Sequence, residues 1–294
     1  MKELTLKDKN AIRDALISYC DNYTSRNRAS ESLNGVSAAT ISTIINSKYT
    51  SISDDMFVRV ATQIGFSFDS WMITDSTAYK EISFALADAQ MYKNVTWVVG
   101  DAGCGKTTAA IDYRRNHRNV FYILCSEDMR RYDFVREISK QVGAPTDGTN
   151  LRDMLEYAIS MVSFLNNPLI IFDEGDKLTD SVFNYFISIY NRLEGHSGIV
   201  FLSTDFIKRR MQSGLRYNKK GYKEINSRIG SRFFEVHPIT RNDIYSICMA
   251  NGLTGEGEIK RVLKDAEISE NDLRRVKRMI HARKRILEHR KEEA

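Results

Sequence analysis

Proline, glycine and long apolar runs are scarce in this sequence of 294 residues. With only 3 prolines and 16 glycines, the chain lacks the composition of a coil linker and favours a helix-rich protein. The absence of any run of about 18 apolar residues predicts no membrane-spanning helix. The polar opening, MKELTLKDKN, lacks the apolar core of a secretion signal, so we expect a cytoplasmic protein without a membrane partner.

Cysteine is also sparse, and its four copies form no CxxC pair and no cluster with histidine. This scatter favours neither a zinc site nor a disulfide framework. Acidic residues are scarce in two segments of the C-terminal half: residues 206–232 carry nine Lys or Arg against Glu224 alone, and residues 271–291 carry nine against two acids. Such segments are either solvated helix faces or surfaces that contact phosphate.

The pattern of apolar residues divides the chain into consecutive regions. Residues 1–70 have the spacing of a compact helical unit, and a junction with buried Trp71 and Met72 is expected over 71–90. From there short β-rich runs alternate with helical stretches, which predicts an α/β core with a parallel sheet flanked by helices over 91–238. The strands are expected at 95–99, 120–124, 169–172, 199–202 and 233–236.

The last region, 239–294, is predicted to be wholly helical. Thr240 with Asp243, and Ser269 with Asp272, have the spacing of helix caps with an acid at the third helical position.

A short helix with a small polar face is predicted at GVSAATISTIINSKY. Such a helix, set between tight turns, suits the major groove of DNA. The segment resembles the second helix of a phage-repressor helix-turn-helix, and the likeness covers residues 10–68. It implies a phosphate contact at Lys48, although units of this kind also dock proteins. The implied groove-facing residues are Ser37, Ala38, Thr40, Ser42 and Thr43.

One segment fits the pattern GxxxxGK[ST] between a predicted strand and a predicted helix that continues with Thr108. Its glycines let backbone N–H groups wrap a phosphate, and the helix N-terminus adds partial positive charge. Lys106 is expected to reach the β- and γ-phosphates of ATP, and Thr107 to hold Mg²⁺. The segment is Gly100-Asp101-Ala102-Gly103-Cys104-Gly105-Lys106-Thr107.

Two carboxylates follow the apolar strand LIIF, 67 residues beyond Lys106. Asp173 is predicted to bind Mg²⁺ through water and Glu174 to polarise the attacking water, because ligands gather at the carboxyl ends of parallel strands. The adjacent Asp and Glu favour hydrolysis over the chemistry of a GTP switch or a simple kinase.

Further polar positions complete the candidate ATPase site. Thr204 is expected either to sense the γ-phosphate or, with Asp205, to cap the next helix. Arg228 or Arg232 is expected to act as an arginine finger toward a neighbouring subunit, unless the two form an ordinary surface pair. Arg274 is expected to reach the nucleotide of its own subunit from a helical lid, unless it only begins a solvated helix.

Together these motifs resemble the AAA+ ATPases over about residues 78–290, although Thr204 departs from the asparagine common at the first sensor. The order of helical unit, small ATPase and short lid is similar to the target-DNA regulators of transposition of the Mu B, TnsC and IstB type. The resemblance implies a homo-oligomer, a ring or a filament, that assembles with ATP and Mg²⁺ on double-stranded DNA with little sequence preference. It also implies delivery of that DNA to a transposase that stimulates hydrolysis. Positive charge alone suggests which residues contact the phosphate backbone of the DNA. These are Arg130, Arg131, Lys140 and, in a basic loop over 206–223, Lys208, Arg209, Arg210, Lys219 and Lys220.

Two other functions remain compatible with the sequence. A helicase loader or plasmid-maintenance ATPase would bind a helicase or a replication initiator in place of a transposase. An ATP-sensing transcription regulator would read one operator with its N-terminal helices, but the stretch from Ser37 to Ile45 lacks Arg, Asn and Gln for base readout.

Overall fold

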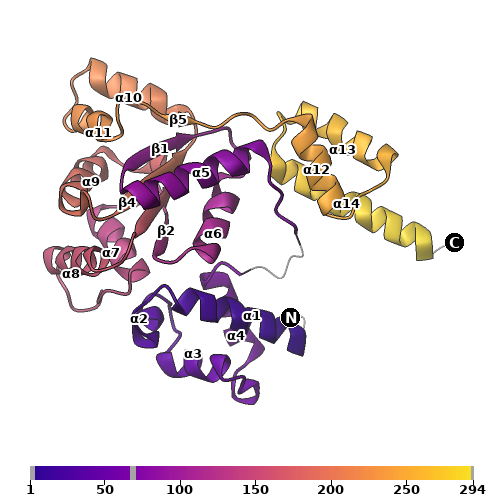
Figure 1. The fold of residues 1–294 in the computed structure, drawn as a ribbon, viewed down its shortest axis with the longest axis horizontal. Helices are drawn as coiled ribbons and strands as arrows, with labels where there is room; N and C mark the ends of the chain where they lie inside the picture. The colour runs from indigo at the N-terminus through magenta and orange to yellow at the C-terminus, as the bar shows by residue number, and fades with distance from the viewer. Residues whose placement is uncertain (1–3, 67–70, 293–294) are drawn as a thin grey trace.

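The structure is a computed structural model that describes residues 4–66 and 71–292. Its elements form three groups: N-terminal helices, a five-stranded sheet with helices on both faces, and C-terminal helices that project to one side (Figure 1). Among the described residues no helix is both long and apolar enough to cross a membrane.

The N-terminal helices pack around a small core of their own. Ile12, Ile41 and Phe57 are fully buried in it. Each helix begins at a Ser or Thr whose side chain accepts a hydrogen bond from the first turn, which satisfies an otherwise unpaired N–H group. The elements are α1 (Leu6–Cys20), α2 (Arg26–Glu31), α3 (Ala38–Ile45), a 3₁₀ turn η1 (Tyr49–Ser51) and α4 (Asp54–Gln63).

The five predicted strands form one parallel sheet in the order β2-β3-β4-β1-β5. Parallel strands place their carboxyl ends at one edge, so the loop after β1, the end of β3 and the end of β4 meet there. The strands are β1 (Val95–Val99), β2 (Val120–Leu124), β3 (Leu169–Asp173), β4 (Gly198–Ser203) and β5 (Phe234–Glu235).

Alternate residues of the strands face two helical layers. On one face Val98 and Val200 pack under α5 and α6. On the other face the rings of Trp97, Phe172 and Phe201 stack beneath α7 to α11. The helices are α5 (Thr77–Tyr92), α6 (Lys106–Asn116), α7 (Arg131–Gln141), α8 (Leu151–Ser163), α9 (Asp180–Leu193), α10 (Phe206–Arg216) and α11 (Tyr222–Arg228), with a 3₁₀ turn η2 (Gly175–Lys177).

The C-terminal helices form a lid whose core takes in two residues from elsewhere. Cys104 of the phosphate loop and Ala78 of α5 are buried among the apolar residues of the lid. The predicted cap at Thr240 is present as a reciprocal pair of hydrogen bonds with Asp243, whose carboxylate also accepts the N–H of Thr77 at 2.9 Å. The lid helices are α12 (Arg241–Ala250), α13 (Glu256–Ile268) and α14 (Leu273–Glu292).

The predicted cap at Ser269 is wrong. Ser269 ends α13, and Asp272 accepts the first hydrogen bond of α14, from the N–H of Arg274 at 2.7 Å. Glu270 and Asn271 adopt the left-handed backbone conformation, with φ of 53° and 59°, and this turn moves the helix start three residues along the chain.

Three further expectations differ from the structure. The segment 206–223, predicted as a basic loop, forms α10 and the beginning of α11. Met72, predicted to be buried, is 58% exposed. Most of the segment 71–90, predicted as a junction, belongs to α5, whose apolar residues pack on the sheet.

Candidate functional site

The phosphate loop joins β1 to α6 and contains two glycines with positive φ, Gly103 at 78° and Gly105 at 102°. A Cβ at Gly103 would lie 2.1 Å from Oδ1 of Asp272, so both the backbone and the space require glycine. The loop leads into the first turn of α6, where free N–H groups and the helix dipole favour an anion. The backbone therefore has the form of a phosphate-binding loop.

The ammonium group of Lys106 turns back over this loop. Its Nζ donates to the carbonyl oxygens of Gly100 at 2.6 Å and Asp101 at 2.8 Å. Lys106 lines a cavity of about 500 Å³ together with most of the predicted ATP-binding residues. Gly100 and Asp101 are not among the lining residues, and they contact Lys106 through their carbonyl oxygens. The other predicted residues that line the cavity are Ala102, Gly103, Cys104, Gly105, Thr107 and Thr108.

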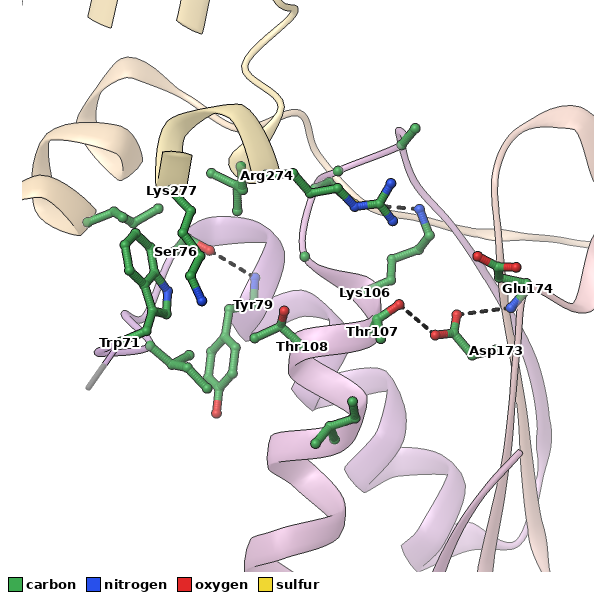
Figure 2. A pocket seen from close by; sticks show the side chains of 18 of the residues that line it. Trp71, Ser76, Tyr79, Lys106, Thr107, Thr108, Asp173, Glu174, Arg274 and Lys277 are labelled. Atoms are coloured by element: carbon green, nitrogen blue, oxygen red, sulfur yellow. Dashed lines mark hydrogen bonds between the residues drawn. The ribbon is translucent and has the colours of Figure 1, made fainter. Parts of the chain in front are cut away.

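The two predicted Mg²⁺ ligands are in direct contact. The hydroxyl of Thr107 donates to Oδ2 of Asp173 at 2.6 Å (Figure 2). Asp173 is 1% exposed, and its Oδ1 accepts the N–H of Glu174 at 2.9 Å. A hydroxyl and a carboxylate side by side suit Mg²⁺, which binds oxygen and completes its shell with water and substrate phosphates.

The carboxylate of Asp173 has one more contact, with a residue that the sequence did not predict. Tyr122, on the edge strand β2, donates its hydroxyl to Oδ2 at 2.8 Å. Burial, together with the charge of Asp173, raises the pKa of Tyr122 far above its usual value, so the phenol remains a donor to the carboxylate. One tyrosine in an apolar strand gives no signal of this contact, which depends on the pairing of β2 with β3.

Glu174 and Thr204 also lie at the phosphate end of the cavity. Glu174 has a left-handed backbone conformation, with φ of 56°, and its carboxylate forms an ion pair with Lys177. Thr204 lines the cavity and donates to Oδ2 of Asp176 at 2.9 Å. No side-chain hydrogen bond caps α10 at Asp205. The structure thus brings Glu174 and Thr204 together with the phosphate loop.

The opposite end of the cavity is apolar and aromatic (Figure 2). It is lined by Trp71, Tyr79, Ile247 and Lys277. The ammonium of Lys277 lies 5.1 Å from the centre of the Trp71 ring. Burial raises the pKa of Tyr79 to about 12. A flat aromatic wall suits a heterocyclic base, and the sequence predicted a binding role for none of these four residues.

Arg274 is the one predicted arginine that lines the cavity. It is the second residue of α14 and extends beside Lys106 over the phosphate loop (Figure 2). The lid holds it there, because the N–H of Leu273 donates to the carbonyl of Gly103 at 3.0 Å. Arg274 therefore lines the same cavity as Lys106, and its contact with a nucleotide stays a prediction.

Arg228 and Arg232 lie outside this cavity and differ from each other. Arg228 donates to Oδ1 of Asn191 at 2.7 Å and lies 5.1 Å from the ring centre of Tyr190. Arg232 is exposed, and within the described parts of the chain no hydrogen bond or ion pair involves it. Arg232 is therefore the one of the pair that is available to a second molecule.

The predicted DNA contacts fall on three surfaces. None of the five small residues predicted to face the groove is buried: four lie on α3, and Ser37 caps the helix by accepting the N–H of Thr40 at 3.1 Å. Lys48, just beyond α3, is exposed. The second surface is the start of α7 with Arg130 and Arg131, both exposed. Lys140, near the end of α7, is half-buried.

The third surface is α10 and the turn after it. Arg209, Lys219 and Lys220 are exposed there. Lys208 forms an ion pair with Glu235 at 2.7 Å.

Arg210 has a structural contact in the same helix. Its guanidinium lies 4.2 Å from the ring centre of Phe183 and donates to Asp180 at 2.7 Å, so it ties α10 to α9.

The family model of the AAA domain matches residues 89–209. The match includes the phosphate loop, both carboxylates and Thr204, and it supports an AAA+ ATPase, a class that generally uses ATP and Mg²⁺. It ends before Arg228, Arg232 and Arg274, whose roles depend on geometry alone. No curated protein matches the chain.

Proposed function

We propose that this chain is an ATPase that assembles on duplex DNA with ATP and Mg²⁺ and delivers the DNA to a transposase, and that hydrolysis releases the DNA. The observation that carries the ATPase is the meeting of Lys106, Thr107, Asp173 and Glu174 at one end of a single cavity. The small residues on the outer face of α3, which are not buried, the basic surfaces and the resemblance to transposition regulators support the DNA and transposase steps.

In this mechanism the loop backbone and Lys106 bind the β- and γ-phosphates. Thr107 and Asp173 would hold Mg²⁺, which supplies charge neutralisation on the phosphates. Glu174 orients a water molecule toward the γ-phosphorus and accepts its proton, while the bond to the bridging oxygen breaks to give ADP and phosphate. Glu174 exchanges its ion pair with Lys177 for the water molecule in this step, and because both side chains are partly exposed this exchange costs little.

A neighbouring subunit completes the site in this proposal. Arg232 is exposed and unpaired among the described residues, so it is the finger that reaches the γ-phosphate of the next subunit. Nucleotide binding and assembly are then linked, because each strengthens the other. Arg228 remains bound to Asn191 and Tyr190.

The test is binding to a random-sequence duplex with ADP or a non-hydrolysable ATP analogue, viewed by negative-stain microscopy. We expect nucleotide-dependent assemblies that weaken steeply with salt. With ATP, Glu174→Gln should trap the assembly on DNA. Arg232→Ala should lose DNA-stimulated hydrolysis but keep nucleotide binding by the single subunit. Lys264→Ala, an exposed lysine of α13, is the matched control.

Two results would contradict the proposal. Tight binding to one palindromic site, indifferent to nucleotide, would identify a transcription regulator. ATPase activity without DNA binding, but with binding to a replicative helicase, would identify a helicase loader.

A further inference from the structure

The N-terminal helices dock on the open edge of the sheet, beside α6 and β2 (Figure 1). The side-chain oxygen of Asn22 accepts the N–H of Asn119, just before β2, at 3.0 Å. Tyr23 donates to a carbonyl at the end of α7 at 2.7 Å, and Arg28 donates to the carbonyl of Gly143 at 3.1 Å. A Cβ at Gly143 would lie 2.7 Å from a backbone oxygen of α2, so the surfaces fit closely. Polar contacts therefore join the N-terminal helices to β2 and to the end of α7, and the ring of Tyr23 packs against Phe121 of β2.

Arg114 of α6 is buried at the centre of this contact, with 8% of its surface exposed. It donates to the carbonyl of Ile64, at the end of α4, at 3.0 Å. Its guanidinium lies 5.7 Å from the ring centre of Tyr19 in α1 and 5.9 Å from that of Tyr122 in β2. No carboxylate of the described chain pairs with it. The aromatic faces and the carbonyl around this buried cation therefore offset the free energy that is lost when its charge leaves water.

Tyr122 has contacts at both ends of its side chain. Its ring faces Arg114, and its hydroxyl donates to the same oxygen of Asp173 that accepts the hydroxyl of Thr107. A continuous series of contacts therefore runs from the metal-binding carboxylate, through Tyr122 and Arg114, to α1 and α4 of the N-terminal unit.

We propose that Tyr122 is a positioning residue for Asp173, and that through Arg114 it couples the nucleotide site to the docking of the N-terminal helices. The inference rests on the proposed binding of ATP with Mg²⁺. A carboxylate that shares its charge with a cation is a weaker acceptor for the tyrosine hydroxyl. The ring of Tyr122 is then free to shift against Arg114. This shift weakens the contact of Arg114 with the ring of Tyr19 and its hydrogen bond to the carbonyl of Ile64. Filling the site thus releases the N-terminal unit, with α3, from the ATPase core.

The test is hydrogen exchange of the full chain in peptides that contain Asn119, whose N–H is held by Asn22 only in the docked state. In the wild type, Mg²⁺ with a non-hydrolysable ATP analogue should accelerate exchange by about fivefold or more, the lower end of typical coupling. Tyr122→Phe keeps the ring and removes the hydroxyl. It should still bind a fluorescent nucleotide, but its exchange should no longer respond. Tyr113→Phe, which loses a hydroxyl bond from α6 to Gln90, is the control and should respond as the wild type.

A second measurement uses the reciprocity of linked equilibria. Asn22→Ala weakens docking without contact with the cavity, and it should raise the affinity for the nucleotide analogue. Unchanged affinity in Asn22→Ala, or a normal exchange response in Tyr122→Phe, overturns the coupling. Wild type that binds nucleotide with no change at Asn119 overturns the coupling but leaves the ATPase standing. Wild type that binds no nucleotide overturns both.

Discussion

The two ends of the nucleotide cavity are built in different ways. The phosphate end comes from one contiguous motif and from the ends of neighbouring strands, so its shape is set by local backbone and sheet pairing. The aromatic end is assembled from residues before and within α5 and from two lid helices, which meet because the lid core includes Ala78 and Cys104. The first end is specified by a short stretch of sequence, whereas the second depends on tertiary packing.

The largest expected loss of nucleotide affinity comes from a substitution at the phosphate end of the cavity. Lys106→Ala removes the ammonium that Gly100 and Asp101 hold over the loop, and it should lower the affinity for ATP by about 100-fold or more, because one partner of a hydrogen-bonded charge pair is lost. Inorganic triphosphate should lose affinity by a similar factor, because it uses only this end. Isothermal titration measures both, and circular dichroism checks that the fold is intact. Equal binding by the variant and the wild type would remove Lys106 from the phosphate site.

The next effect tests the contact between the lid and the phosphate end. Arg274→Ala should lower the affinity for ATP by about tenfold and that for ADP much less, because a charge-assisted contact to the terminal phosphate is lost. Arg278→Ala, an exposed arginine one turn further along α14, is the matched control. Competition titration with a fluorescent nucleotide gives both affinities. An equal loss for ATP and ADP would place Arg274 away from the γ-phosphate.

A smaller loss of affinity is expected from a substitution that changes only the aromatic end of the cavity. Trp71→Ala should lower the affinity for ATP by about tenfold, because base–aromatic contact is worth about 1–3 kcal/mol. Inorganic triphosphate should bind as it does to the wild type. The contrast with Lys106→Ala separates the two ends in one series of titrations. A similar loss for both ligands would mean that Trp71 acts through the position of the lid, whose α14 it contacts at Lys277.

The same contrast explains what the sequence predicted. The strands and the phosphate loop follow from apolar runs and glycine positions, and the structure has them within a residue or two, with β5 shorter than expected. Tyr122 on Asp173 was not predictable, because only the pairing of β2 with β3 brings them together. Ser269 was predicted as a cap from spacing alone, and two left-handed residues after it move the helix start. Segment 206–223 was predicted as a loop from its many basic residues. The helical spacing of the buried Ile207 and Met211 was not weighed against that charge.

The smallest effect concerns the lid that forms the aromatic end. Thr240→Ala removes the cap of α12 and should lower the free energy of unfolding by about 1 kcal/mol at pH 7. Thr240→Ser keeps the hydroxyl and is the control, and thermal denaturation measures both. Burial acts to raise the pKa of Asp243, but hydrogen bonds from Thr240 and Thr77 outweigh it and hold the pKa below the usual 3.8. This depressed pKa contributes stability above pH 3.8, which is lost as the pH falls through the folded-state pKa. The difference between Thr240→Ala and the wild type should therefore narrow in acid, and a difference that widened there would show that Thr240 does not act through the Asp243 carboxylate.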